Sequence, residues 1–349
     1  MIEAKNSSRN IAVDLLRTTA ILIMLIANSA PYVLQKHHAP MLRLFCSLAA
    51  PLFIFLSGYS FFISLRGKNE FRKKLNGAFF LLITAILIDT VVWGIVPFQT
   101  FDVLYVIAFG IILNLLLRKL SWKIKLLIPL AFVFCGHFLR MWLGYQFSVN
   151  EIRIAEIFSN IAGVFKWKSF LVDGWFPLFP WLALSILGAI VGEIEHHLIR
   201  YWKLALPLFI LSFFSSVYYL LYKRPLPPER EGYLELFYPA TLSVMCMAIS
   251  FSIGCILLFS KIFSPASSSV ILSTVSLPGR HSLLVYFLHG IVIHYLFELF
   301  FDEYNMLKFS LLMLVFFIFF YLLLYLRETK KVNHFIHLFP LPIKKILGL

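Results

Sequence analysis

Charged residues are scarce in this sequence. Asp, Glu, Lys and Arg together make up 14% of its 349 residues, whereas 60% are hydrophobic, and the mean hydropathy is +0.87. Soluble domains carry about a quarter charged residues, so this composition excludes them. Apolar runs of roughly 18 to 22 residues, the length of a membrane-spanning helix, recur along the whole chain. We therefore expect an integral membrane protein with a single transmembrane domain over residues 1–349.

Cysteine is also rare, and no pair of cysteines has the spacing that is typical of metal-binding or redox motifs. The four cysteines lie in apolar runs with no CxxC pair; they are Cys46, Cys135, Cys246 and Cys255. Free cysteines in such runs behave as small buried hydrophobes, so neither a zinc site nor a disulfide framework is indicated. The chain also lacks a soluble-type repeat and the inverted repeat of many transporters. We expect no bound metal.

The apolar runs predict an all-α polytopic bundle of about ten transmembrane helices. The expected spans are 11–34, 41–65, 78–96, 101–118, 125–144, 176–195, 203–222, 239–259, 281–300 and 307–326. The 38 phenylalanines suit lipid-facing surfaces. Because the number of spans is even, both chain ends are expected on the same side of the membrane.

The net charge of +14 has a distribution that points to a membrane surface. With a cytoplasmic N-terminus, twenty Lys and Arg residues fall in cytoplasmic segments and ten in the opposite loops. This twofold excess follows the positive-inside rule, and basic loops facing anionic headgroups account for the net charge. We expect N- and C-termini in the cytoplasm, contact with membrane lipids, and no nucleic acid partner.

The first span, DLLRTTAILIMLIAN, carries polar side chains on one face. Asp14 and Arg17 are three residues apart, so they are neighbours and can pair. Asn28 lies eleven residues after Arg17, and eleven steps of about 100° return to nearly the same azimuth, roughly 16 Å along the axis. A lined pocket is one interpretation. The other is that Asp14 and Arg17 snorkel to the headgroups while Asn28 caps the helix.

Histidines in and beside the membrane are candidates for proton transfer, because imidazole titrates near neutral pH. His37 and His38 follow the first span near the outer interface, although adjacent loop histidines are more often solvated surface. His289 lies near mid-membrane in the ninth span, on the same helix face as Ser282 and Tyr286. An imidazole at that depth needs a partner or water, so structural and functional roles both remain open for it.

Two acids also lie at depth, Asp89 in the third span and Asp102 at the start of the fourth. Either one can orient a histidine or pair with Arg17, and spacing does not choose between these partners.

Several of these stretches, taken in order, resemble the heparan-α-glucosaminide N-acetyltransferase family and its bacterial relatives. The family pattern is Asp, two apolar residues, Arg, an apolar run ending in Asn, a Lys-His loop, and a Pro-Phe segment leading to a turn of small residues with Gly. The matching positions here are Asp14, Arg17, Asn28, Lys36 with His37, Pro51 to Phe53, and Ser57 with Gly58. FDVLYVIAFGIIL (101–113) resembles a further block, and FPLFPWL with LPGRHSLLVYFLH resembles the bacterial branch.

Two departures from the family pattern affect the site. Thr18 stands where the family has Gly after the arginine. The loop also offers two histidines, so the catalytic position is His37, which follows Lys36, or alternatively His38.

The resemblance implies a transmembrane acyltransferase in the bacterial inner membrane. Its donor substrate would be cytosolic acetyl-CoA or a short acyl-CoA, and its acceptor an amine or hydroxyl of a glycan or glycolipid on the extracytoplasmic side. Catalysis would involve His37 or His38, with Asn28 holding the thioester carbonyl as amide donors hold oxyanions. The residues expected to bind the donor are Asp14, Arg17, Arg280 and His289.

A transporter or flippase for a small solute or lipid-linked sugar is the main alternative, because intramembrane charges and a mid-membrane histidine serve transport equally well. A purely structural membrane protein ranks last, since it leaves the aligned polar residues without a purpose. The acceptor, N- against O-transfer, a direct against a ping-pong route, and assembly into a homodimer all stay open at the level of sequence.

Overall fold

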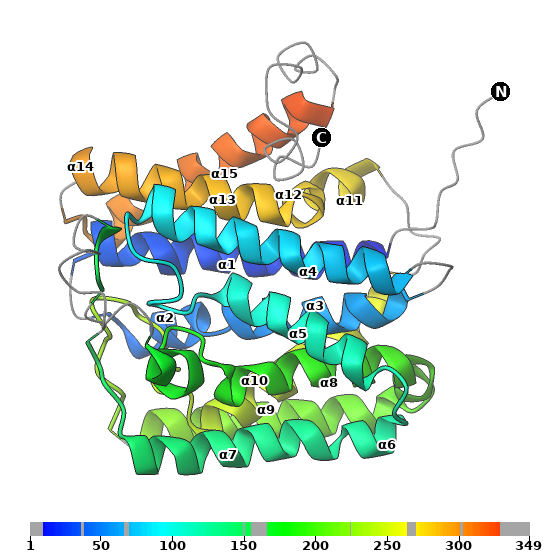
Figure 1. Ribbon diagram of the computed structural model, residues 1–349. Helices are drawn as coiled ribbons and strands as arrows, with labels where there is room; N and C mark the ends of the chain where they lie inside the picture. The colour runs from blue at the N-terminus through cyan, green and yellow to red at the C-terminus, as the bar shows by residue number, and fades with distance from the viewer. Residues whose placement is uncertain are drawn as a thin grey trace.

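The computed structural model describes residues 10–35, 38–65, 70–148, 151–154, 166–223, 225–263, 270–300 and 303–328. In these ranges the regular elements are helices, which pack side by side in one bundle (Figure 1). The elements are α1 (Ile11–Val33), α2 (Pro40–Cys46), α3 (Ala49–Ile63), α4 (Glu70–Leu87), η1 (Ile88–Val92), α5 (Val103–Leu117), α6 (Trp122–Lys125), α7 (Leu127–Leu143), η4 (Ser169–Asp173), α8 (Leu178–Arg200), α9 (Trp202–Tyr222), α10 (Leu242–Ile262), α11 (Val270–Val275), α12 (Leu277–Arg280), α13 (Ser282–Val292), η5 (Ile293–Phe297), α14 (Glu298–Phe300) and α15 (Met306–Glu328). The three η elements are π-helical turns.

The expected polytopic helix bundle is confirmed. Eight segments of the described chain are long and apolar enough to cross a membrane. Two shorter apolar helices, Val103–Leu117 and Ser282–Phe297, occupy the places of the fourth and ninth expected spans. Since successive segments run in alternate directions, α1 begins and α15 ends at the same end of the bundle.

The third span begins earlier than the apolar run suggested, at Glu70 instead of residue 78. Its first turns are charged, and Lys73 donates to Glu70 at 3.0 Å along the exposed helix surface. Long basic side chains at a helix end can extend to the headgroups, so the helix continues past the point where hydropathy falls. We call this end of the bundle, where α1 and α4 begin, the basic end.

Helices α3 and α8 approach each other through small residues. A Cβ atom at Gly58 would lie 1.8 Å from the Ser185 carbonyl oxygen, and one at Gly188 would lie 2.0 Å from the Phe55 carbonyl oxygen. Small residues allow such backbone contact between membrane helices. Ser57 and Gly58, which match the turn of the family pattern, lie inside α3, within the second expected span.

The short helix α12 lies against the first turns of α1. A Cβ at Gly279 would lie 1.9 Å from the Asp14 carbonyl oxygen. The Thr18 hydroxyl accepts from the Gly279 backbone N–H at 3.0 Å and donates to the Asp14 carbonyl at 3.1 Å. Thr18, which departs from the family pattern, thus joins α1 to α12.

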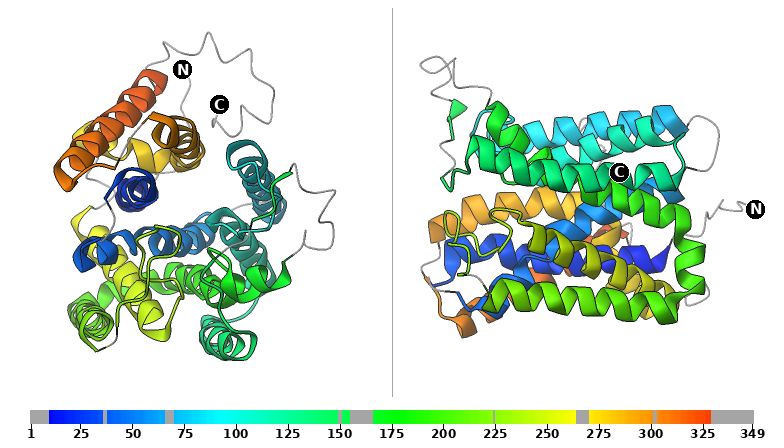
Figure 2. Two further views of the ribbon diagram at one scale, coloured as in Figure 1. Left: turned by 90° about the vertical axis from the view of Figure 1, so that its left-hand side faces the viewer. Right: turned by 90° about the horizontal axis from the view of Figure 1, so that it is seen from below.

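The helices differ in how much of their surface meets other helices. Those at the centre, α1, α3 and α8, bury most of their residues, whereas α7 and α9 bury few and lie at the periphery (Figure 2). The exposed faces of these outer helices are apolar, including Phe134, Phe138 and Leu211. Such faces suit lipid contact, which places the polar residues of the central helices in the interior.

Candidate active site

A cavity of about 1220 Å³ extends along the interior of the bundle. Its walls come from α1, α3, α4, α5 and α13. At the basic end the cavity is lined by Asn10 and Lys74. At the opposite end it is lined by Glu151 and Glu235, which come from loops. The cavity is larger than the roughly 300 to 1,000 Å³ of most small-molecule pockets, and it reaches both ends of the bundle.

The mouth at the basic end carries two cations. Arg17 contacts Asp14, Nη1 to Oδ1, at 3.4 Å, and its Nη2 donates to the Ser60 hydroxyl at 2.7 Å. Lys74 donates to the Ser64 hydroxyl and lies near enough to Arg17 for electrostatic interaction. Asp14 is 3% exposed. The mouth combines positive charge with hydroxyl groups, which suits an anionic ligand such as a phosphate.

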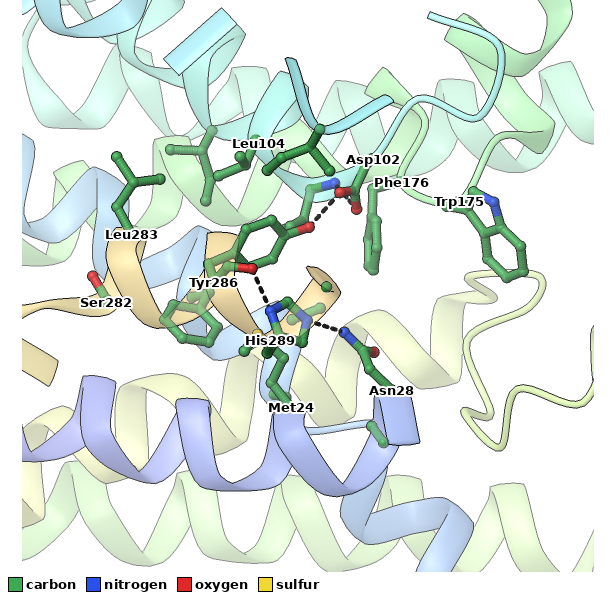
Figure 3. Close-up of a pocket in the computed structure, with 18 of the residues that line it drawn as sticks. Met24, Asn28, Asp102, Leu104, Trp175, Phe176, Ser282, Leu283, Tyr286 and His289 are labelled. Atoms are coloured by element: carbon green, nitrogen blue, oxygen red, sulfur yellow. Dashed lines mark hydrogen bonds between the residues drawn. The ribbon is translucent and has the colours of Figure 1, made fainter. Parts of the chain in front are cut away.

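Deeper in the cavity, Asn28 of α1 meets His289 of α13, with 2.9 Å between Asn28 Nδ2 and His289 Nε2 (Figure 3). The other ring nitrogen, Nδ1, bonds the backbone carbonyl of Tyr286. Because a carbonyl only accepts, the proton lies on Nδ1, and Nε2 is the acceptor for the Asn28 amide. His289 therefore presents an unprotonated nitrogen to the cavity beside an amide donor.

A phenol–carboxylate contact holds the helix that carries His289. The Tyr286 hydroxyl donates to Asp102, whose other oxygen caps α5 by accepting from the Val103 N–H at 2.6 Å (Figure 3). Asp102 thus contacts Tyr286 and Val103, and among the described residues neither a histidine nor Arg17 is hydrogen-bonded to it. Tyr286 in turn carries the backbone carbonyl that His289 contacts.

Asp89, the second acid at depth, takes a different partner. Its Oδ2 accepts from the Tyr105 hydroxyl at 2.5 Å and from the Phe98 N–H at 3.3 Å. Asp89 lies in the π-helical turn η1. Such turns are often found at functional sites, and this one directs Asp89 into the cavity wall.

The opposite mouth is acidic and aromatic. Glu151 and Glu235 line it with Tyr32, Trp175 and Tyr233. Trp175 is hydrogen-bonded to Glu151, and Tyr32 is hydrogen-bonded to Tyr233. The two ends of one cavity therefore differ in charge.

Four of the expected site residues line this cavity together: Asp14, Arg17, Asn28 and His289. The polar stripe of the first span is thus a cavity wall, and Asn28 lies within α1, which continues to Val33.

Arg280 and His38 lie elsewhere. Arg280 pairs with Glu328 at 3.0 Å and donates to the Ser273 carbonyl at 2.5 Å, because α12 meets the end of α15. The His38 side chain is buried, with Nδ1 2.9 Å from Glu229 Oε1. Neither residue is among those that line the cavity in the described chain. His37 lies outside the described residues.

Sequence reasoning missed Lys74, Trp175, Tyr233 and Glu235 as site residues. Lys74 was counted only as one of many basic loop residues, although it lies in the first turns of α4 and near Arg17. Glu235 had a usable signal, since it is a lone acid in the otherwise apolar and aromatic stretch YLELFY (233–238). The direction of the Glu235 side chain depends on how a Pro-rich loop folds, and the spacing of residues in the sequence does not show that.

Comparison with known families identifies the family of the chain. The family model described as heparan-α-glucosaminide N-acetyltransferase, catalytic, matches residues 9–224. A comparison with curated proteins finds no match. The matched range includes Asp14, Arg17 and Asn28, and it ends before Glu235 and His289. Because the match covers more than half of a polytopic helix bundle, the chain belongs to the heparan-α-glucosaminide N-acetyltransferase family of membrane acetyltransferases.

Proposed function

We propose that this protein transfers an acetyl group, or a short acyl group, across a membrane. Cytosolic acetyl-CoA would enter at the basic end, and an amine or hydroxyl of a glycan or glycolipid would receive the group on the extracytoplasmic side. The observation that carries this proposal is one cavity with a cationic mouth, an Asn–His pair inside, and an acidic, aromatic mouth at the other end. The resemblance of 277–289 to bacterial relatives favours the bacterial inner membrane.

The basic end suits the donor's phosphates. Arg17 and Lys74 supply fixed positive charge beside the Ser60 and Ser64 hydroxyls, and charge-assisted bonds to phosphate are among the stronger hydrogen bonds. Asn28 is eleven residues further along α1, roughly 16 Å at 1.5 Å per residue. An extended pantetheine arm along this wall would bring the thioester to the Asn28–His289 pair.

The chemistry at the pair can be balanced. For an amine acceptor, the thioester C–S bond breaks and a C–N bond forms, and the proton lost by the nitrogen passes through His289 Nε2 to the departing sulfur. The Asn28 amide would donate to the carbonyl oxygen as negative charge develops on it. The Tyr286 backbone carbonyl would keep the imidazole proton on Nδ1, and Nε2 would accept the proton once the Asn28 amide turns from it to the thioester carbonyl.

The resemblance to the family gives a second route, through the loop histidines. In it, the acyl group moves first to a nitrogen of His37 or His38 and then to the acceptor. Substitution of both by Ala separates the two routes. Full transfer activity in that variant would restrict the chemistry to His289, whereas loss of activity with retained donor binding would assign the acyl intermediate to the loop.

The first test is binding of acetyl-CoA to the purified protein in detergent. We expect saturable binding that weakens about ten- to a hundredfold in Arg17→Ala, since a charge-assisted contact is worth roughly 1.5 to 3 kcal/mol. Lys203→Ala removes an exposed lysine at the same end, outside the cavity, and serves as the matched control. Failure of the folded wild-type protein to bind acetyl-CoA would contradict the proposal.

A cavity that extends between both ends of the bundle also fits a transporter, which keeps that alternative testable. Proteoliposomes loaded with an amino sugar and supplied with external acetyl-CoA separate the two functions. Acetylated product in the lumen supports transfer. Recovery of the sugar outside, unmodified, supports transport.

A further inference from the structure

The segment that follows the Pro-rich loop is held firmly against the second span. Arg43 is 5% exposed, and its Nε donates to the Leu234 carbonyl at 2.8 Å and its Nη2 to the Pro227 carbonyl at 2.7 Å. The Ser47 hydroxyl, at the break between α2 and α3, accepts from the Leu236 N–H at 2.7 Å. The chain between these contacts is therefore fixed relative to the helix bundle.

Side chains of this segment alternate in direction, as expected for extended backbone. Leu234 and Leu236 are fully buried, and Leu234 belongs to the main hydrophobic core. Tyr233 and Glu235 line the cavity. The fixed segment thus directs one phenol and one carboxyl into the opposite mouth.

Glu235 is 5% exposed, and its Oε2 has no hydrogen-bond partner within the part of the chain that the structure describes. Its other contact is with its own backbone N–H. The nearest opposing charge is Arg43, whose guanidinium is already bonded to two carbonyl oxygens. A buried carboxyl oxygen without a partner is costly, so this one is suited to a donor that the protein itself does not supply.

Other charges at this mouth give it a surplus of negative charge. Glu151 and Glu231 line the cavity here and interact electrostatically with each other. The opposing cations are Arg153 on the wall and Lys166, which does not line the cavity. Tyr32, Tyr233, Trp175 and Tyr238 add aromatic rings. Aromatic faces and carboxyl groups together attract cations, so a positively charged ligand fits this mouth better than a neutral one.

A series of contacts links this mouth to the Asn28–His289 pair. Tyr32 lies four residues after Asn28 and therefore on the same face of α1, and its hydroxyl is hydrogen-bonded to Tyr233, two residues before Glu235. One helical turn and one hydrogen bond thus connect the reacting pair to Glu235.

We propose that Glu235 binds the acceptor as a protonated primary amine and accepts one of its protons before transfer. This inference rests on the proposed acetyl transfer. An ammonium must lose one proton to expose its lone pair, and the Glu235 carboxylate takes it, leaving a neutral amine and a neutral carboxylic acid. The amine then attacks the thioester as described above, and the carboxylic acid releases its proton to water at this end of the cavity.

The test compares glucosamine with glucose, which carries a hydroxyl in place of the ammonium. Acetyl transfer from acetyl-CoA to each sugar is measured with the full-length protein in detergent, together with acetyl-CoA binding. The variants are Glu235→Gln, which keeps the shape and removes the charge, and Glu235→Asp, which keeps the charge on a shorter side chain. Glu303→Gln is the matched control, an exposed glutamate of another loop at the same end, outside the cavity.

We expect wild type to prefer glucosamine. Glu235→Gln should raise the KM for glucosamine at least tenfold with acetyl-CoA binding unchanged. The KM of Glu235→Asp should lie between the values of wild type and Glu235→Gln. An unchanged KM in Glu235→Gln would overturn this inference and leave the proposed function standing. The same conclusion would follow if wild type bound acetyl-CoA but did not prefer glucosamine. If wild type fails to bind acetyl-CoA, the proposed function itself fails, and this inference with it.

Discussion

Burial of Glu235 in the loop at the opposite mouth raises the pKa of its carboxyl to about 8, despite the opposing effect of Arg43. In the unfolded chain the same group titrates near its ordinary value of 4.5. Between these values the folded protein binds more protons than the unfolded chain, so stability falls as pH rises through this window. At pH 9 the folded protein without a ligand holds an ionised carboxylate in a site that disfavours it, and a bound ammonium would lower the pKa of Glu235 and keep the carboxylate ionised at neutral pH.

This linkage predicts that Glu235→Gln is more thermostable than wild type above pH 8 and close to wild type at pH 5. Thermal unfolding in detergent, measured from pH 5 to 9, checks it. Glu303→Gln should follow wild type throughout. A constant difference between Glu235→Gln and wild type over the whole range would mean that ionisation of Glu235 is not responsible.

The contact between Asn28 and His289 predicts coupled effects on catalysis. Removal of an amide that stabilises a developing oxyanion typically costs about 10² to 10³ in kcat, so Asn28→Ala should lose at least this much acetyl transfer. His289→Ala should lose a similar factor, and the double variant less than the product of the two, because the residues act as a unit. His137→Ala, on the exposed face of α7, is the control. Independent, multiplicative losses would argue against a shared role.

At the scale of elements, the approach of α12 to α1 depends on one glycine. A Cβ at Gly279 would lie 1.9 Å from the Asp14 carbonyl oxygen, so one helix must move. We expect Gly279→Ala to destabilise the protein by about 1 to 3 kcal/mol, as overpacking does, and to weaken acetyl-CoA binding, since Asp14 contacts Arg17. Thermal unfolding and donor binding measure both effects.

Gly77 of α4 provides the matched control for this substitution, because a Cβ there meets nothing within 4 Å. Ala also has the higher helix propensity, so Gly77→Ala should be neutral or stabilising. Equal effects of the two substitutions would show that the α12–α1 contact does not limit stability.

The loops at the opposite end are joined by Arg230, which is 1% exposed. Its guanidinium donates to the carbonyls of Asp173, Gly174 and Phe147 and to the Tyr145 hydroxyl, at 2.6 to 3.2 Å. It also lies over the Trp175 ring, 4.8 Å from the centroid. This single side chain therefore positions a cavity wall.

Lysine lacks the fork of donors that these contacts need, so Arg230→Lys should loosen the loops. We expect faster proteolysis at the opposite end and a higher KM for the acceptor, with acetyl-CoA binding retained. Arg118→Lys, at an exposed position on the basic end, should match wild type. Loss of donor binding in Arg230→Lys would instead indicate global unfolding.

At the scale of the whole molecule, the asymmetry of charge predicts orientation. We expect the basic end to face the cytoplasm. With a membrane-impermeant maleimide on intact cells, Glu303→Cys should be labelled and Lys119→Cys should be labelled only after lysis, both positions being exposed in loops at opposite ends. The reverse pattern would place the cationic mouth outside and remove the proposed route for a cytosolic donor.

The sequence by itself determined the membrane bundle, the approximate places of ten spans and the polar stripe of the first helix. These properties depend on hydropathy and on the period of 3.6 residues, both of which act locally. For the same reason Asp14, Arg17 and Asn28 were found before any fold was known.

Only the tertiary structure decided which groups meet. Asn28 contacts His289 across 261 residues of chain, Arg280 turns to Glu328 and away from the cavity, and Glu235 enters the cavity because Arg43 and Ser47 hold its loop. Each of these outcomes depends on how helices from distant parts of the chain pack and on where the loops between them are fixed. Neither can be derived from the local spacing of residues.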